Sequence, residues 1–112
     1  MSENFVLVTV KNGTPVSIGS RGTRENLSEC AKDANARYNK DGLNHIVVPV
    51  GQKGTETATV VTINKKDPTY SSVGQPISKR SAIDASIWSD KNYKKDGYNS
   101  FIVGSNCKYF DY

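Results

Sequence analysis

The chain has 112 residues, a hydrophobic fraction of 36% and a formal net charge of +4. This length suits one domain with a shared core, because two separate units of about 50 residues would each bury too little surface to be stable. No apolar run approaches the roughly 20 residues that a membrane-spanning helix needs, which argues against an integral membrane protein. The N-terminal residues also lack the apolar stretch of a secretory signal, so we expect a soluble protein of the cytoplasm.

The chain begins with a predicted β-hairpin. Residues 5–10 are rich in β-branched side chains, as is typical of a strand. Asn12-Gly13 follows, which is the preferred pair for a two-residue turn with positive φ angles. Residues 15–18 alternate apolar and polar side chains, so they should return antiparallel with one face on the core.

A helix and a third strand are predicted next. Thr23 can cap the N-terminus of the helix, and Gly42 can end it by taking the left-handed conformation. Between them, apolar residues recur at intervals of three and four positions, which predicts an amphipathic helix. They are Leu27, Cys30, Ala31, Ala34 and Tyr38. Residues 44–50 form the expected third strand.

The second half of the chain repeats the first. Residues 38–48, Tyr-Asn-Lys-Asp-Gly-Leu-Asn-His-Ile-Val-Val, return 55 positions later as residues 93–103, Tyr-Lys-Lys-Asp-Gly-Tyr-Asn-Ser-Phe-Ile-Val. The same offset, carried backwards without a gap, matches Val8 with Ile63. A repeat kept in register over this length predicts an internal duplication. The predicted parts of the single domain 1–112 are repeat one at 3–51, repeat two at 58–106 and an aromatic C-terminal tail at 107–112.

Each repeat should supply three strands and one helix. In the second repeat we expect a strand at 57–66, a turn at Asp67-Pro68, a return strand at 70–74, a helix from Ser78 or Ser81 to about Lys95, and a strand at 101–103. Six strands and two helices in this order predict a two-layer α+β fold. We expect one mostly antiparallel six-stranded sheet with both helices on the same face.

The residue types that catalysis or metal binding requires are scarce. His45 is the single histidine, and its counterpart in the second repeat is Ser100. Cys30 and Cys107 are the only cysteines, and neither has a partner at the spacing of a metal or redox motif. A lone histidine within a strand is more often a surface residue than a general base. We therefore expect no catalytic residue, no metal and no cofactor, and we interpret the protein as a non-enzyme.

Positive charge is concentrated in the second half. Residues 57–112 carry 8 Lys and Arg against 5 Asp and Glu, whereas residues 1–56 carry 7 against 6. Paired lysines and loop arginines are candidate anion-binding residues, since such groups contact phosphates. They are Arg21, Arg24, Lys65, Lys66, Lys94 and Lys95. Aspartates interleave with the basic pairs of the second half and no aromatic platform is evident beside them, so solvated surface lysines are the favoured interpretation and nucleic-acid binding is the alternative.

The two predicted helices differ on the face that should meet solvent. Where the first helix has polar residues the second has apolar ones: Ser28, Lys32 and Asp33 against Ile83, Ile87 and Trp88. Because the second helix is apolar where the first is polar, we expect this apolar stripe to be covered either by another part of the same chain or by a bound partner. The candidate cover is the aromatic tail, Tyr109, Phe110 and Tyr112. The predicted partner-binding residues are Ile83, Ile87 and Trp88 with the basic residues Lys79, Arg80 and Lys91.

A compact duplicated α+β unit with a short hairpin, a Tyr-x-Lys-Asp-Gly helix end at 38–42 and 93–97, and no catalytic set resembles the small accessory proteins of tailed bacteriophages. Many proteins of that kind inhibit a host or defence protein by binding it. The resemblance implies a protein-binding module in the host cytoplasm, whose partner is a host or defence protein or a second copy of the chain. The inhibitors of that kind that imitate DNA are strongly acidic, whereas this chain is basic.

Overall fold

The computed structural model describes residues 3–67 and 71–110, and of residues 109 and 110 the backbone alone. The elements of the first half are β1 (Phe5–Lys11), β2 (Thr14–Ile18), α1 (Arg24–Tyr38), the 3-10 helix η1 (Asn39–Asp41) and β3 (Leu43–Pro49). Those of the second half are β4 (Thr57–Asn64), β5 (Ser71–Val73), β6 (Ile77–Ser78), α2 (Lys79–Tyr93), the 3-10 helix η2 (Lys94–Asp96), β7 (Tyr98–Gly104) and β8 (Tyr109–Phe110). The expected α+β class is confirmed. Pro68, in the predicted turn, lies outside the described residues.

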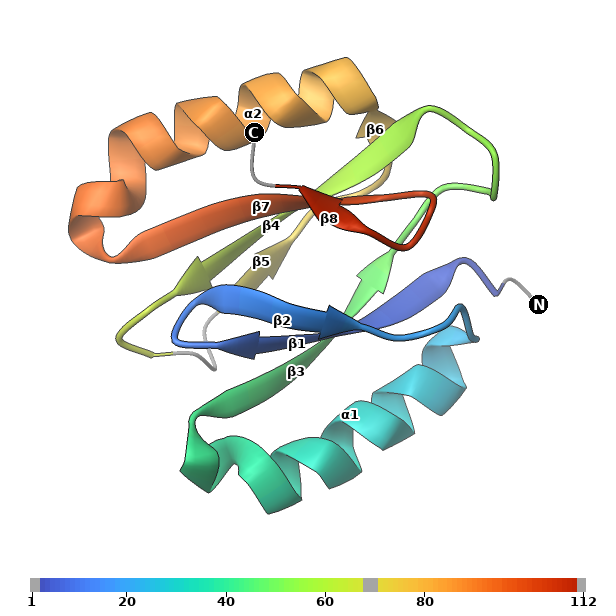
Figure 1. The fold of residues 1–112 in the computed structure, drawn as a ribbon, viewed down its shortest axis with the longest axis vertical. Coiled ribbons are helices and arrows are strands. Elements are labelled where there is room, and N and C mark those ends of the chain that lie inside the picture. Colours follow the sequence, from blue (N-terminus) through green and yellow to red (C-terminus); the bar gives the residue numbers. More distant parts are fainter. Residues whose placement is uncertain (1–2, 68–70, 111–112) are drawn as a thin grey trace.

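The strands form two antiparallel sheets, so the expected single six-stranded sheet is wrong. The strand order is β2-β1-β3 in the first sheet and β5-β4-β7-β8 in the second, where β6 also pairs with β4. The two sheets face each other in the middle of the molecule, with α2 outside the second sheet and α1 outside the first (Figure 1). The molecule thus has four layers instead of the expected two, and its helices cover opposite outer faces rather than one common face.

Both faces of each sheet carry apolar residues, which explains why a two-layer arrangement fails. In β1, Val6 and Val8 are fully buried, while the alternate residues Phe5 and Leu7 are half-buried. A sheet in a two-layer fold would leave one of these faces in water. Here the valine face packs against the other sheet, and the opposite face lies towards α1.

The main core lies between the two sheets. It contains Val6, Val8, Val10, Ile46, Val48 and Val50 from the first half and Val61, Ile63, Phe101 and Val103 from the second. Phe101 is the largest fully buried side chain among the described residues. Because each half supplies one wall of this core, neither half can bury its apolar sheet face alone.

The two halves pair their strands in the same pattern. However, the first strand of each half does not correspond at the constant offset of 55 positions that the sequence comparison assumed. Val8 pairs with Ile46 in the first sheet, and Val61 pairs with Phe101 in the second. The step from Ile46 to Phe101 is 55 positions, whereas the step from Val8 to Val61 is 53. The second half therefore has two additional residues between β4 and β5, and the match of Val8 with Ile63 is corrected to Val61. A slip of two residues keeps every side chain on its face, so alternation alone cannot detect it. The duplication as the origin of the chain stays a prediction.

Turn and cap residues adopt the conformations that their types favour. Asn12 and Gly13 have φ angles of +53° and +79° in the turn between β1 and β2. The side chains of Thr23 and Ser78 cap the N-termini of α1 and α2, each by accepting a backbone hydrogen bond of 3.2 Å. The glycines after η1 and η2, Gly42 and Gly97, are left-handed, with φ angles of +82° and +93°. These local predictions are confirmed.

Candidate partner-binding surface

Helix α2 buries a narrow stripe against the outer face of the second sheet. Ala82 and Ser86 are fully buried there. Ile83 is half-buried and packs against the small apolar cluster of Ala58, Ala82 and Ile102. The sheet therefore covers much of Ile83, which makes this residue part of the packing beneath α2.

Ile87 and Trp88 lie on the outside of α2. Their side chains are 44% and 59% exposed, respectively. The counterparts in α1, Lys32 and Asp33, are exposed as well. Of the three apolar replacements in α2, these two thus present apolar area to solvent where α1 presents charge.

The C-terminal tail adds a strand at the edge of the second sheet. The backbone of residues 109 and 110 forms β8, which pairs with Ile102 and Val103 of β7. The side chains expected as a cover for α2, those of Tyr109, Phe110 and Tyr112, lie outside the described residues.

Trp88 is the first ring of an aromatic cluster that also contains Tyr93 and Tyr98. The rings of Trp88 and Tyr93 meet edge to face with centroids 5.8 Å apart, and those of Tyr93 and Tyr98 do so at 6.4 Å. Such pairs stabilise one another by about 0.5 to 1.5 kcal/mol beyond their burial. Sequence spacing does not predict this cluster, because residues five positions apart are not neighbours on a helix surface and Tyr98 belongs to the next strand. The one feature of the sequence that could have indicated this cluster is the replacement of Leu43 by Tyr98 at the corresponding position of the second half.

A pocket of about 300 Å³ opens beside the aromatic cluster. Tyr93 and Tyr98 line it together with three hydroxyl side chains, those of Thr62, Ser72 and Ser89. The volume is at the lower end of the range for ligand pockets. The pocket can receive a flat or apolar group of a partner beside these rings and offers hydroxyls to a polar edge.

Four of the candidate anion-binding lysines gather where α2 ends. The Lys65 backbone N–H donates to the Gly97 carbonyl at 2.7 Å, and a Cβ placed on Gly97 would lie 3.9 Å from Cδ and Cε of Lys66. Helix η2 supplies the other two, Lys94 and Lys95. All four side chains are exposed. Tyr98 follows Gly97 directly, so the aromatic cluster stands beside these lysines, which the sequence did not indicate.

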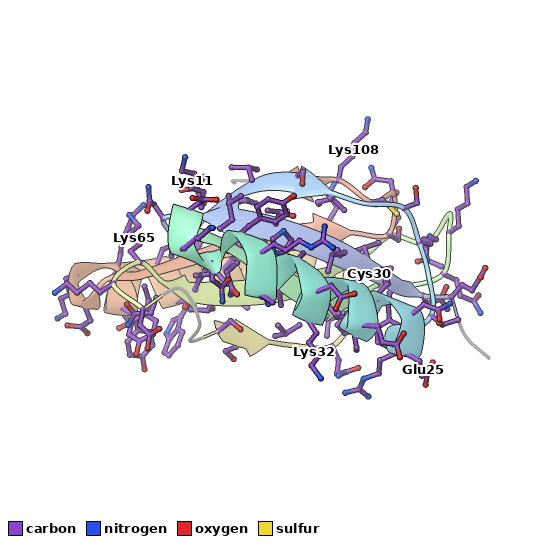
Figure 2. All side chains as sticks on the ribbon, turned by 90° about the horizontal axis from the view of Figure 1, so that it is seen from below. Lys11, Glu25, Cys30, Lys32, Lys65 and Lys108 are labelled. Carbon is purple, nitrogen blue, oxygen red and sulfur yellow. The ribbon has the colours of Figure 1, made fainter. Side chains whose placement is uncertain are left out.

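The hairpin turn of the first half reaches the same end of the molecule. Asn99 Nδ2 donates to the Gly13 carbonyl at 2.8 Å, and a Cβ on Gly13 would lie 2.6 Å from Lys65 Cγ. Lys11, the last residue of β1, therefore lies at this end with Lys65, while Glu25 lies at the opposite end (Figure 2). The turn of one half and the helix end of the other thus form one basic surface.

The two candidate arginines lie in different surroundings. The Arg21 guanidinium donates to three protein oxygens: Asn4 Oδ1 at 3.0 Å, the Gly51 carbonyl at 2.8 Å and the Ser105 carbonyl. The bond to Ser105 connects the first half with the second, and the other two stay within the first half. The Arg24 guanidinium instead lies over the Phe5 ring, 6.0 Å from its centroid. The structure thus gives Arg21 internal partners and leaves Arg24 at the surface.

The basic residues predicted around the apolar stripe are spread along α2. Lys79, in the first turn, is half-buried, whereas Arg80 and Lys91 are exposed. Arg80 precedes Ile87 by seven positions and Lys91 follows it by four, so all three share one side of the helix. We call Ile87, Trp88, Tyr93, Arg80 and Lys91 the α2 surface.

His45 is held by α1. Asn35 Oδ1 accepts from the His45 backbone N–H at 2.7 Å and lies 2.9 Å from its Nδ1, and Asn35 Nδ2 donates to the His45 carbonyl at 3.2 Å. The second half has a similar link, in which the Ser100 backbone N–H donates to Asp90 Oδ1 at 3.0 Å. The surroundings of His45 therefore serve to attach α1 to β3.

Stability should depend on the protonation of His45. Partial burial lowers the pKa of His45 below its ordinary value of 6.5, so the unfolded chain binds a proton more readily than the folded one. The resulting contribution of His45 to the free energy of unfolding is present above the pKa of His45 in the unfolded chain. It is lost as the pH falls through the lower pKa of His45 in the folded chain. We expect urea unfolding to show a steeper loss of stability between about pH 7.5 and about pH 5.5 in the wild type than in His45→Ser. Equal slopes would contradict this role; serine is the matched replacement because Ser100 stands at the corresponding position.

Within residues 3–67 and 71–110, no group of three or more His, Cys, Asp or Glu side chains is placed to hold a metal ion. None of the helices in this described part is long and apolar enough to cross a membrane. Comparison of the chain with protein-family models, with curated proteins and with solved structures found no match.

Proposed function

We propose that the protein is a non-enzymatic binding module whose α2 surface docks a partner protein with an apolar pocket and an acidic rim. The observation that carries this proposal is the exposure of Ile87 and Trp88, where the corresponding helix has lysine and aspartate. Water disfavours such apolar area by roughly 25 cal/mol per Å², and a partner that covers it would recover that free energy. Tryptophan is also among the residue types that most often dominate the energy of an interface.

Charge favours a different protein over a second copy of the chain as the partner. Arg80 and Lys91 flank Ile87, and Lys94 and Lys95 follow the aromatic cluster. Asp84 is the acidic residue on the same side of α2, so the surface remains net positive. A symmetric dimer through it would bring two net positive surfaces together, which costs free energy, whereas an acidic rim would attract the basic residues. The resemblance to phage accessory proteins supports inhibition of a host or defence protein in the host cytoplasm as the biological role.

The variant Ile87→Lys tests this proposal. It restores the residue type of Lys32 at an exposed position, so the fold should persist. Hot-spot residues contribute about 2 kcal/mol or more, so the affinity for the partner should fall at least about 30-fold. The immobilised wild type would be used to isolate partners from a bacterial lysate, and calorimetry with each purified candidate would then give Kd.

The matched control is Ala36→Lys, which adds the same charge to the exposed side of α1 at the position that corresponds to Lys91. This control should bind as the wild type does. A candidate bound equally well by Ile87→Lys would contradict the proposal. Analytical ultracentrifugation provides a second check, since a dimer broken by Ile87→Lys would show that the occupant is a second copy.

Single-stranded nucleic acid is a second candidate partner, favoured by the aromatic cluster beside four lysines. Bases stack on exposed aromatic rings while lysines contact the phosphates. Trp88 is the only tryptophan, so its fluorescence reports directly on this surface. Binding of a single-stranded oligonucleotide should quench Trp88 and weaken with salt by a slope of about 0.7 per phosphate contacted. The double variant Lys94→Gln/Lys95→Gln should lower that slope, and an absence of quenching at low salt would remove this candidate.

A further inference from the structure

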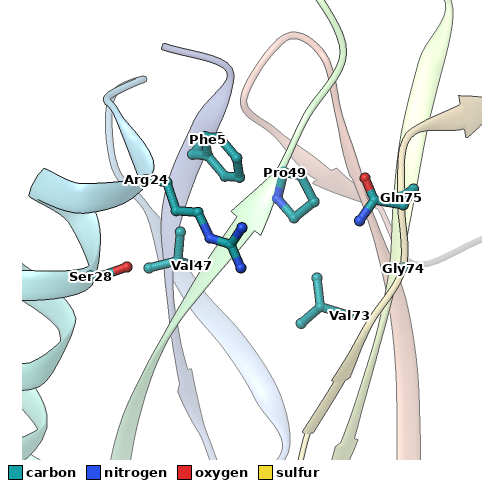
Figure 3. A pocket seen from close by; sticks show the side chains of 8 residues that line it. All are labelled: Phe5, Arg24, Ser28, Val47, Pro49, Val73, Gly74 and Gln75. Atoms are coloured by element: carbon teal, nitrogen blue, oxygen red, sulfur yellow. The ribbon is translucent and has the colours of Figure 1, made fainter. Parts of the chain in front are cut away.

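A second pocket lies away from α2, between α1, the first sheet and β5. It has a volume of about 300 Å³ and is lined by Phe5, Arg24, Ser28, Val47, Pro49, Val73, Gly74 and Gln75. Figure 3 shows these side chains around one space, with Arg24 and Ser28 on the side of α1 and Val73 and Gln75 on the side of the second sheet. Both halves of the chain thus contribute walls to this pocket.

Arg24 is the charged group of this pocket. Its guanidinium carbon lies 6.0 Å from the centroid of the Phe5 ring, and Figure 3 shows the group pointing into the space between Val47, Pro49 and Val73. Among the described residues, no carboxylate or other oxygen acceptor is seen bonded to it, in contrast to Arg21. The stacked ring limits the positions that this arginine can take, which lowers the cost of ordering it on a ligand. The Arg24 guanidinium is therefore restricted in position, and its N–H donors are available to a ligand.

The rest of the lining indicates the class of ligand. Ser28 and Gln75 add uncharged hydrogen-bonding groups, and the described residues that line the space include no acidic one. The remaining walls are apolar, from Phe5, Val47, Pro49 and Val73. A planar carboxylate matches the guanidinium fork, and an apolar body attached to it would bury against these walls. A small hydrated anion such as phosphate would leave the apolar walls in water.

The corresponding place in the second half lacks this combination. Arg24 corresponds to Lys79 at the step of 55, and Phe5 corresponds to Ala58 at the step of 53 that applies to β1 and β4. A lysine beside an alanine has neither the fork nor the stacked ring. The arginine-over-aromatic arrangement is thus a property of the first half and not a by-product of the repeated fold.

We propose that this pocket binds a carboxylate carried on a small apolar group, with Arg24 as the anion anchor. The two sources of such a group are the C-terminal residue of a peptide and a free small carboxylic acid. The site lies between α1, the first sheet and β5 and has no lining residue from α2, so it is independent of the α2 surface and of the partner proposed there.

The test uses the full chain labelled with ¹⁵N and three probes: N-acetyl-leucine, its uncharged amide N-acetyl-leucinamide, and inorganic phosphate. N-acetyl-leucine should shift the backbone amide signals of residues that line the pocket with a Kd on the order of 1 mM, as suits a ligand of this size. N-acetyl-leucinamide should give no saturable shift. Isocaproate, which has the same side chain and carboxylate without the peptide group, separates the sources: weaker binding than N-acetyl-leucine indicates a peptide terminus, and equal or tighter binding indicates a free acid.

Two variants and one control complete the test. Arg24→Gln removes the charge and should weaken the binding of N-acetyl-leucine at least tenfold. Ser28→Phe fills the pocket but retains the charge of Arg24, and it should weaken this binding as well. Arg37→Gln, an exposed arginine in the last turn of the same helix, should leave Kd unchanged. Each variant is first shown to unfold at the same denaturant concentration as the wild type. Binding that survives Arg24→Gln, absence of any saturable shift, or phosphate that binds as tightly as the carboxylates would each overturn the proposal.

Discussion

Phe101→Ala is expected to lower the free energy of unfolding by about 3 to 5 kcal/mol. Phe101 is fully buried in the core between the two sheets, so its removal leaves a cavity lined by valines and isoleucines of both halves. Domains of this size are stable by only about 5 to 15 kcal/mol in total, so this single change should move the urea midpoint far downward. Circular dichroism during urea unfolding measures the effect.

Trp88→Ala is the matched control, because it removes a larger aromatic side chain from an exposed position. Trp88 is 59% exposed and outside the core, so we expect a loss of no more than about 1.5 kcal/mol, chiefly from its ring contact with Tyr93. The contrast between the two variants tests the four-layer arrangement, in which Phe101 faces the opposite sheet. A Phe101→Ala variant as stable as Trp88→Ala would show that the two sheets do not share a core.

Arg21→Met should have the second largest effect, a loss of about 2 to 3 kcal/mol in the free energy of unfolding. Hydrogen bonds to charged groups contribute about 1.5 to 3 kcal/mol each, but Arg21 is partly exposed and water can replace some of its bonds. Methionine keeps much of the side-chain volume and removes the donors to Asn4, Gly51 and Ser105. Urea unfolding of the wild type and the variant measures this loss.

The control for Arg21 is Arg37→Met. Arg37 is exposed in the last turn of α1, so its replacement should change stability by no more than about 0.5 kcal/mol. The same experiment repeated in phosphate separates a structural Arg21 from an anion site. If Arg21 binds an anion instead of connecting the halves, Arg21→Met would be as stable as the wild type in phosphate-free buffer and would lack any stabilisation by phosphate.

Part of the candidate surface could be inferred from the sequence. The exchange of Lys32 and Asp33 for Ile87 and Trp88 is visible in the repeat, and the structure shows both apolar residues exposed. The same comparison grouped Ile83 with them, although the sheet covers much of it. The helical period alone does not show whether a residue at the edge of the apolar face is buried or exposed, because the width of the buried face depends on what packs against it.

The gathering of Lys65 and Lys66 beside Tyr98 could not be inferred in this way. These residues are more than 30 positions apart in the chain and meet because β4 pairs with β7, with Asn64 opposite Tyr98. The pocket around Arg24 depends likewise on β5 of the second half lying close to β1 and β3 of the first. Neither the meeting of the two lysine pairs nor the pocket has a signal in any single stretch of sequence.

The sequence by itself determined the local structure of this protein: the Asn12-Gly13 turn, the caps of both helices, the left-handed glycines that end them, and the alternating strands. Each of these depends on residues within a few positions of one another, whose steric and hydrogen-bonding preferences are nearly independent of the rest of the fold. Only the tertiary structure decided that the strands divide into two facing sheets, that the helices lie outside them on opposite faces, and that β1 and β4 correspond at a step of 53. An alternating strand shows that it has two faces but not what covers each one, and a slip of two residues leaves that alternation unchanged.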